Sequence, residues 1–250
     1  MCGIVGYVGS REAAPILIDG LRKLEYRGYD SAGLAVHDGS QIEILRAVGK
    51  LENLDRALRS QQLHGSTGLG HTRWATHGRP SEPNAHPHAA GSVAVVHNGI
   101  IENHLALKRE LEADGVRFSS DTDTEIVAHL VDRALAASAG NLMLAVRSAL
   151  SRVRGAYALA VVCKEMPDRI VVAKSASPLV LGVGDGEMLC GSDIPALLGH
   201  TKRMLFLEDG EMAELTAGGY PAASPFGEAI GTRAQGVNST PANGPEGGQK

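Results

Sequence analysis

The chain has 250 residues, of which 43% are apolar and 21% charged, with a formal net charge of −4. These values are typical of a globular protein and exclude a strongly basic surface for nucleic acid or anionic membranes. No apolar run reaches the roughly 18–20 residues of a membrane helix, and the N-terminus has no signal-peptide pattern. Three cysteines are too few for a disulfide framework, so we expect a cytoplasmic protein without nucleic-acid or membrane partners.

The N-terminal part of the chain combines strand and helix patterns. Apolar residues at helical spacing predict a helix over residues 12–24, and a polar helix is expected over residues 51–62. The dipeptide Asp38-Gly39 between two apolar runs indicates a hairpin, and residues 78–90 read as a loop rich in proline and histidine. The expected strands are residues 3–8, 32–37, 41–48, 67–73 and 92–97.

The central part of the chain is expected to be helical. One helix covers residues 102–114 and stops at Gly115. The next helix runs to residue 136 and starts at Thr122, which has capping-box spacing to Glu125. A third helix is expected over residues 141–152. The expected strands that follow are residues 156–163, 169–174, 179–183, 203–207 and 211–215.

The order of these elements indicates the fold class. Strands come in runs with paired helices between them, without the regular alternation of a doubly wound parallel sheet. Two mostly antiparallel sheets with helices outside fit this order better. From residue 217 onward the composition shifts to glycine, proline, alanine, serine and asparagine. We therefore expect one domain over residues 2–216 and a flexible tail over residues 217–250.

The position of Cys2 suggests that this residue acts as a nucleophile. If the initiator methionine is removed, Cys2 carries a thiol and a free α-amine, which titrate near ~8.5 and ~7.7–8.0. One residue then supplies both a nucleophile and a general base. The alternative is that Cys2 is a small buried hydrophobic residue at the start of the first strand.

Five segments dense in polar residues and glycine lie next to strand ends, at residues 26–31, 71–78, 84–88, 97–103 and 119–125. Together with the Cys2 start, they resemble the glutaminase domain of the class II, N-terminal-nucleophile glutamine amidotransferases. Within that family they are most similar to the glucosamine-6-phosphate synthases. The resemblance extends from Cys2 to about Leu215 and rests on the runs CGIVGYVG, LRKLEYRGYDSAGLAV, GHTRWATHGRPSEPNAHPH, VVHNGIIENH, SDTDTEIVAHL and SPLVLG.

The resemblance implies an α/β (α+β) architecture, the four-layer α/β/β/α sandwich of N-terminal-nucleophile hydrolases. It implies that L-glutamine is hydrolysed to glutamate and ammonia through a thioester on Cys2, without a cofactor. It further implies that the ammonia serves the synthesis of glucosamine 6-phosphate from fructose 6-phosphate. The sugar-isomerase half of such synthases has no counterpart in these 250 residues.

Hydrolysis of an amide by a thiol needs hydrogen-bond donors for the oxyanion, and Asn98 and Gly99 can supply them. Asn98 has a side-chain amide, and a glycine at position 99 lets a backbone N–H approach the substrate closely. The alternative for this dipeptide is a type I′ hairpin turn. The resemblance favours the oxyanion site.

Free glutamine also presents a carboxylate and an ammonium group. Arg73 can bind a carboxylate through two parallel hydrogen bonds, and Asp123 can pair with an ammonium group. The alternatives are a surface arginine and an aspartate that caps a helix, and the resemblance favours glutamine binding. It also implies supporting residues around the same pocket: walls from Trp74, Thr76 and His77, a brace for the N-terminus from Arg27, and an ordering role in the nearby loop for His86.

The remaining polar candidates are expected to be structural. The sequence offers five histidines as possible metal ligands: His71, His77, His86, His88 and His97. Their spacings match no standard zinc motif, so we expect no metal. Cys163 and Cys190 lie in apolar strand patterns and are expected to be inert core residues. Ser192 and Asp193 are expected to cap a short helix.

The setting of this chemistry stays open at the level of sequence. The chain can be an excised domain, a free-standing subunit that passes ammonia to a separate sugar-isomerase subunit, or the amidotransferase part of another pathway. An acylase on the same scaffold needs an apolar pocket, which Arg73 and Asp123 disfavour. A non-catalytic glutamine sensor is a further alternative, but we expect it to lack part of the catalytic set. Lys174 and Ala176 stand where the family is expected to have arginine and glycine.

Overall fold

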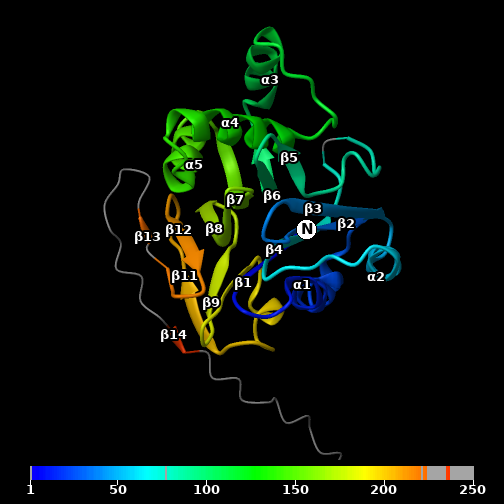
Figure 1. Ribbon diagram of the computed structural model, residues 1–250. Coiled ribbons are helices and arrows are strands. Elements are labelled where there is room, and N and C mark those ends of the chain that lie inside the picture. Colours follow the sequence, from blue (N-terminus) through cyan, green and yellow to red (C-terminus); the bar gives the residue numbers. More distant parts are fainter. Residues whose placement is uncertain (1, 77, 221, 224–234, 237–250) are drawn as a thin grey trace, which may run out of the picture.

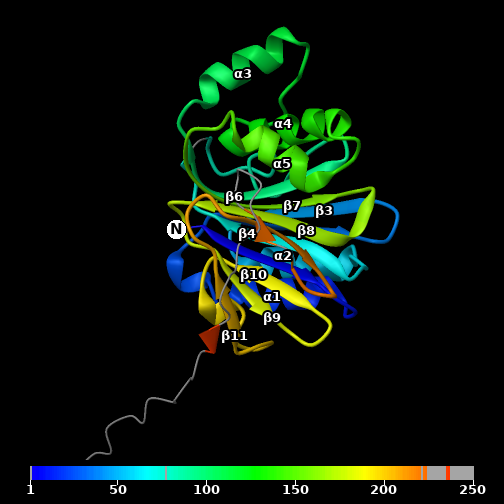
Figure 2. The same cartoon turned by 90° about the vertical axis from the view of Figure 1, so that its left-hand side faces the viewer.

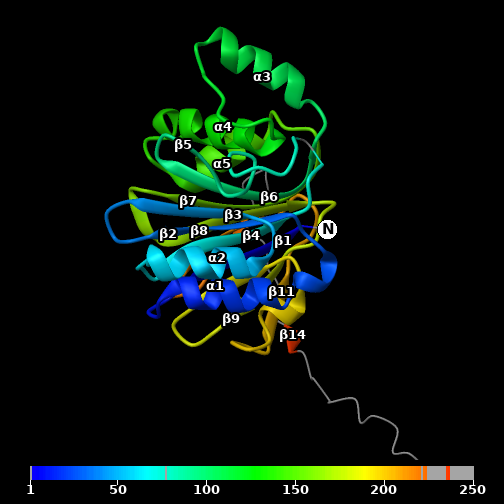
Figure 3. The ribbon, with the colours of Figure 1, turned by 90° about the vertical axis from the view of Figure 1, so that its right-hand side faces the viewer.

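The computed structural model describes residues 2–76, 78–220, 222–223 and 235–236. In this part of the chain two β-sheets lie face to face, and helices cover the outer face of each sheet (Figure 1). Figures 2 and 3 show the resulting order of layers, with α4 and α5 on one side and α1 and α2 on the other. The predicted four-layer α/β/β/α sandwich of antiparallel sheets is confirmed.

The first sheet has the strand order β14-β11-β9-β10-β1-β4-β2-β3, and its neighbouring strands are antiparallel. Its strands are β1 (Gly3–Val8), β2 (Ser31–His37), β3 (Ile42–Val48), β4 (Thr67–Arg73), β9 (Val180–Val183), β10 (Met188–Gly191), β11 (Arg203–Phe206) and β14 (Gln235–Gly236). The long pairing of β1 with β4 sets Gly3 opposite Thr72. The start of β1 and the end of β4 therefore meet at one edge of the sandwich.

The second sheet has the order β13-β12-β8-β7-β6-β5, again antiparallel. Its strands are β5 (His88–Ala90), β6 (Val93–Ile101), β7 (Gly155–Cys163), β8 (Met166–Ser175), β12 (Met212–Thr216) and β13 (Ala222–Ala223). The strand β6 carries Asn98 and Gly99 toward the same edge of the sandwich as the start of β1.

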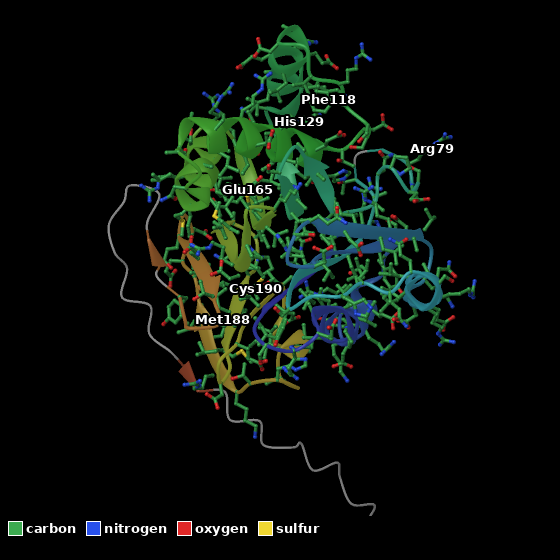
Figure 4. The ribbon with its side chains drawn as sticks, viewed as in Figure 1. Arg79, Phe118, His129, Glu165, Met188 and Cys190 are labelled. Carbon is green, nitrogen blue, oxygen red and sulfur yellow. The ribbon has the colours of Figure 1, made fainter. Side chains whose placement is uncertain are left out.

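Five α-helices lie outside the sheets in the described residues. Helices α1 (Ala13–Arg22) and α2 (Leu51–Ser60) cover the first sheet, and α4 (Asp123–Ala137) and α5 (Leu142–Leu150) cover the second. Helix α3 (His104–Ala113) packs on α4. Phe118, after α3, lies edge-on to His129 of α4 with 5.1 Å between ring centroids (Figure 4). Two 3₁₀ turns, η1 (Glu25–Arg27) and η2 (Ile194–Ala196), lie near the start of β1. None of the described helices has the length and apolar character needed to span a bilayer.

The apolar strands are buried on both faces, which explains their continuous hydrophobic runs. Along β1, Ile4 and Val8 face the second sheet, whereas Val5 and Tyr7 belong to the apolar layer under α1. Cys190 lies in the layer between the sheets, where burial raises the pKa of its thiol to about 12. The expectation that Cys190 is an inert core residue agrees with this environment.

Several expected elements are confirmed and others need correction. The strands β1 and β4 occupy the expected ranges, but β5, β10, β13 and β14 were not among the expected strands; Figure 4 labels Met188 and Cys190 of β10. The capping box is wrong, because Thr122 makes no side-chain cap and the Glu125 carboxylate accepts hydrogen bonds from the backbone of Ser119 and Ser120, both at 2.7 Å. Most of residues 217–250 lies outside the described residues, so the boundary at residue 216 stays a prediction.

Ala176, one of the two positions expected to differ from the family pattern, has a strained backbone. Ala176 follows β8 with φ of 54°, a left-handed conformation that costs an alanine about 1–2 kcal/mol. We expect Ala176→Gly to raise the free energy of unfolding by about 0.5–1 kcal/mol, because the relief of strain exceeds the added entropy of the unfolded chain. Urea denaturation measures this change.

Two matched substitutions control this prediction. Ala139 has φ of 49°, so Ala139→Gly should stabilise the protein similarly. Ala134 lies inside α4, where a glycine should instead lower the stability by about 1 kcal/mol. A loss of stability in Ala176→Gly would contradict the assignment of strain.

Candidate functional site

A cavity of about 470 Å³ opens at the edge of the sandwich where β1 begins and β4 and β6 end. It is lined by most of the residues that the sequence singled out: Cys2, Arg27, Arg73, Trp74, Thr76, His86, Asn98, Gly99 and Asp123. His77 lies outside the described residues. The lining residues that the sequence analysis did not assign to the site are His97, Ile100, Thr122, Thr124, Ser177 and Pro178.

Cys2 lies directly before β1 and is partly exposed in this cavity. Its Sγ accepts a hydrogen bond from the Trp74 backbone N–H at 3.2 Å and lies 3.6 Å from the Trp74 carbonyl oxygen. Burial raises the pKa of the Cys2 thiol, and the bond from the Trp74 N–H partly opposes this shift. The thiol is thus held protonated near neutral pH, so a base must remove its proton before it can attack.

Asn98 and Gly99 lie inside β6 and not in a turn. They are paired with Ala158 and Tyr157 of β7, which excludes the type I′ hairpin alternative. Gly99 has φ of 132°, and a Cβ at this position would lie 2.0 Å from the Ala156 carbonyl oxygen. Only glycine fits there. The Asn98 amide Nδ2 donates to the Cys2 carbonyl oxygen at 3.1 Å, which joins the second sheet to the nucleophile candidate.

Arg73 and Asp123 reach the cavity from different layers. Arg73 ends β4 and is only 3% exposed, so the surface-arginine alternative is excluded; its Nη2 donates to the Gly78 carbonyl oxygen at 3.0 Å. Asp123 is the first residue of α4, and Thr122 occupies the capping position. The Asp123 carboxylate accepts the Ile101 backbone N–H at 2.8 Å, at the end of β6. A buried cation and a buried anion thus line the same cavity.

The mouth of the cavity is apolar. Trp74 is 54% exposed and Ile100 is 44% exposed. The Trp74 ring lies against Gly28, where a Cβ would come within 2.5 Å of the ring and where φ is 73°. Glycine at position 28 therefore leaves the space that the indole occupies.

Arg27 connects the cavity to the segment after β10. Its Nη2 pairs with the Asp193 carboxylate at 2.5 Å and donates to the Ser192 carbonyl oxygen at 3.4 Å. Asp193 caps η2, as expected, and the Ser192 hydroxyl accepts the Ile4 backbone N–H at 3.1 Å. Ser192 therefore holds the start of β1 and does not cap the helix, which corrects half of the sequence expectation. A bracing role for Arg27 stays a prediction.

The buried histidines form hydrogen bonds with one another and with threonines. His86 contacts Thr124 and His88 contacts Thr122, each at 2.9 Å. Burial lowers the pKa of His88 to about 3 and that of His86 well below its usual value. Among the described residues, no three His, Cys, Asp or Glu side chains gather in a way that could hold a metal ion.

Comparison with known proteins identifies the family. A family model described as a glutamine amidotransferase domain matches residues 71–199, a little over half of the chain. The chain belongs to the glutamine amidotransferase domain family. The matched range includes β6, α4 and the end of β4, which bring Asn98, Asp123 and Arg73 to the cavity.

Curated relatives of this amidotransferase domain are considerably longer. Glutamine--fructose-6-phosphate aminotransferase [isomerizing] from Symbiobacterium thermophilum is 50% identical over 99% of the chain, and the match covers 41% of that protein. The protein of the same name from Thermus thermophilus is 54% identical over 88% of the chain and 36% of its own length. The chain thus spans less than half of these relatives.

Solved structures support the N-terminal-nucleophile amidotransferase fold. Glutamine phosphoribosylpyrophosphate amidotransferase from B. subtilis superimposes with a TM-score of 0.78 at 28% identity, over 90% of this chain and 49% of the other. A glutamine aminotransferase class-II domain protein from Silicibacter pomeroyi has a TM-score of 0.58 at 16% identity, over 89% and 99%. The second likeness bears on the fold alone.

Proposed function

We propose that the amidotransferase domain hydrolyses L-glutamine to glutamate and ammonia through a γ-glutamyl thioester on Cys2. One observation carries this proposal. Cys2, Arg73, Asn98, Gly99 and Asp123 come from four separated segments of the chain, and all of them line one cavity. A thiol, oxyanion donors and a pair of opposite charges are the groups that a zwitterionic amide substrate requires.

In the proposed acylation step, the Cys2 sulfur attacks the carboxamide carbon of glutamine. The free α-amine of Cys2, exposed by removal of Met1, takes the thiol proton and delivers it to the leaving nitrogen as the C–N bond breaks. The Asn98 Nδ2 and the Gly99 backbone N–H donate to the oxyanion of the tetrahedral intermediate. Water then attacks the thioester and releases glutamate, which restores the thiol.

Recognition of the amino-acid end is assigned to the two charged residues. Arg73 binds the α-carboxylate and Asp123 binds the α-ammonium group. Both side chains are nearly buried, so their attraction to the ligand is weakly screened by water. Trp74 and Thr76 are assigned to walls of the pocket, and His86 is assigned to ordering the loop before β5.

The pairing of Asp123 with the ammonium group predicts a selective loss of affinity. We expect Asp123→Asn to raise KM for glutamine about 10- to 100-fold, with a much smaller change in kcat, because a hydrogen bond to a charged group contributes about 1.5–3 kcal/mol. The asparagine still accepts the Ile101 N–H, so the end of β6 stays in place. Steady-state glutaminase kinetics measure both constants.

Asp132 offers a matched control on the same helix. Its carboxylate accepts the Ser92 backbone N–H at 2.9 Å outside the cavity, so Asp132→Asn should leave KM unchanged. An unchanged KM in Asp123→Asn, or an equal rise in both variants, would remove the ammonium-binding role of Asp123.

For the larger reaction, we propose that residues 2–216 act as the glutaminase part of a glutamine–fructose-6-phosphate aminotransferase. Its ammonia would pass to a sugar-isomerase part outside these 250 residues, for the synthesis of glucosamine 6-phosphate. The identity of about 50% to relatives of that name supports this setting. An ammonia-producing part of another pathway is the second candidate, because a phosphoribosylpyrophosphate amidotransferase has the same fold.

One assay separates these possibilities. The purified chain is incubated with glutamine, with and without fructose 6-phosphate, and glutamate and glucosamine 6-phosphate are measured. The proposal predicts glutamate alone in both incubations. No glutamate above the background would favour a non-catalytic glutamine-sensing module, and glucosamine 6-phosphate made by the chain alone would contradict the need for a separate sugar-isomerase part.

A further inference from the structure

Next to Asn98 lies a group of buried side chains that take no part in the proposed chemical steps, and all of them except His71 also line the cavity. This histidine network consists of His71 on β4, His86, His97 on β6 and Thr124 on α4. The rings of His71 and His86 meet edge-on with 4.0 Å between their centroids. The network joins the two sheets to α4 directly behind Asn98.

The backbone fixes the position of one proton in this network. The Nε2 of His71 lies 3.1 Å from the His97 carbonyl oxygen, which can only accept a hydrogen bond. His71 therefore carries its proton on Nε2. The same Nε2 lies 3.0 Å from the Asn98 side chain, so the atom of the amide that faces it must be the oxygen, Oδ1. The Asn98 Nδ2 then points the other way, toward Cys2.

The other contacts extend this network to α4. His86 Nδ1 lies 3.0 Å from both ring nitrogens of His71, so it lies over the face of the His71 ring and packs against it edge-on. The Thr124 hydroxyl lies 2.9 Å from His86 Nε2 and 2.9 Å from His97 Nδ1, and it can donate to one ring while it accepts from the other. Thr124 thus links the His86 and His97 rings.

The environment keeps the rings neutral. Burial lowers the pKa of His71 to about 3 and that of His86 well below its usual value, and the neighbouring Arg73 acts in the same direction on both. The direction of the hydrogen bonds is therefore constant over the physiological pH range.

We propose that His71 is a positioning residue, whose Nε2–H holds the Asn98 amide with Nδ2 directed at the oxyanion, and that the His97 carbonyl sets the tautomer of His71 while His86 and Thr124 hold its ring in place. This inference rests on the proposed role of Asn98 in glutamine hydrolysis. A rotated amide would present Oδ1 to the developing negative charge and would repel it. The contact from Nδ2 to the Cys2 carbonyl and the contact from His71 to Oδ1 together exclude that rotation.

Two substitutions at His71 test the contact. His71→Leu removes the donor, and we expect kcat for glutamine hydrolysis to fall about 10- to 100-fold with little change in KM, somewhat less than the loss of an oxyanion donor itself. His71→Gln offers an amide N–H at similar reach and should restore much of kcat. The alkylation rate of Cys2 by iodoacetamide should be unchanged in both variants, because the thiol and its surroundings remain.

His37 provides a matched control. It is a buried histidine on β2 of the same sheet, and its ring bonds the Lys164 carbonyl and the Gly39 backbone N–H. We expect His37→Leu to lower stability and to keep kcat. If His71→Leu does not fold, Thr124→Val and Thr124→Ser test the same network: the valine should lower kcat several-fold, and the serine should restore it because it keeps the hydroxyl.

A double-mutant cycle distinguishes positioning from general destabilisation. If His71 acts through Asn98, His71→Leu should cause no further loss of kcat in an Asn98→Ala background. The inference would be overturned if the losses of kcat in the two single variants multiplied in the double variant, or if His71→Leu kept a wild-type kcat. It would also be overturned if His71→Leu removed a limb of the pH–rate profile, because His71 would then be a general base. A wild-type protein that releases no glutamate would instead overturn the proposed function, and the role of His71 with it.

Discussion

Glutamate release should fall by about 10⁴-fold or more when Cys2 is replaced by alanine, because the acyl-enzyme route then has no nucleophile. The fold should persist, since the Cys2 Sγ makes only a weak bond with the backbone of Trp74 and its loss costs about 1 kcal/mol or less. A coupled assay for glutamate on the purified variant measures the rate, and thermal unfolding measures the stability.

Cys163 is the natural control for this prediction. It is buried in β7 and donates to the Glu165 carboxylate at 3.0 Å, and burial raises the pKa of its thiol to about 12. Cys163→Ala should therefore hydrolyse glutamine like the wild type, and iodoacetamide should modify Cys2 in preference to Cys163. Substantial turnover by Cys2→Ala would show that the thiol is not the nucleophile.

The second large effect is expected at Asn98. We predict that Asn98→Ala lowers kcat about 10²- to 10³-fold, the usual effect of removing one oxyanion donor, with KM for glutamine nearly unchanged. The side chain contacts the Cys2 carbonyl and His71 but lies within a strand whose backbone pairing is independent of it. The loss should therefore appear in the chemical step, which single-turnover kinetics measure.

Asn103 provides the comparison. Its amide also bonds the backbone, donating to the Arg152 carbonyl at 2.8 Å and accepting the Arg154 N–H at 2.9 Å, but it lies outside the cavity. Asn103→Ala should lower stability and leave kcat intact. If both asparagine variants lost activity equally, or if Asn98→Ala changed only KM, Asn98 would not be an oxyanion donor.

The strand with the clearest apolar pattern was predicted correctly from the sequence. The strand β1 was predicted with its observed bounds, because it is an apolar run. The strand β4 was also predicted with its observed bounds, although Leu69 is its one large apolar residue among glycine and polar residues. The apolar pattern around Cys190 was noted, but no bounds were predicted for β10, because it has only four residues between a glycine-containing turn and η2. Short strands of this kind are stabilised by their neighbours in the sheet and carry little local signal.

Asn98-Gly99 shows why local propensity fails at the site. The dipeptide favours a turn by itself, but pairing with β7 and the approach of the Ala156 carbonyl to Gly99 keep it in an extended strand. Glu125 is similar: its spacing from Thr122 suits a capping box, yet its carboxylate binds the Ser119–Ser120 backbone. In both cases contacts beyond the local motif outweighed the local preference.

Sequence motifs singled out most of the residues that line the cavity, but the interactions between them could not be predicted from the sequence. His71 appeared in the sequence only as one of several histidines with poor metal spacing. Its contact with Asn98 depends on the approach of β4 to β6 across two sheets, and its tautomer depends on the carbonyl of His97. Such information arises from packing and has no signature in residue spacing.

The proposed reaction requires the Cys2 sulfur to attack the glutamine carboxamide while the free α-amine of Cys2 takes the thiol proton. Rapid acid quenching during turnover, followed by mass spectrometry of the N-terminal peptide, detects the acyl-enzyme. We expect a glutamyl adduct on Cys2 in protein without Met1, and neither adduct nor turnover in protein that retains Met1. Full turnover by the Met1-retaining protein, or turnover without any adduct on Cys2, would contradict this mechanism.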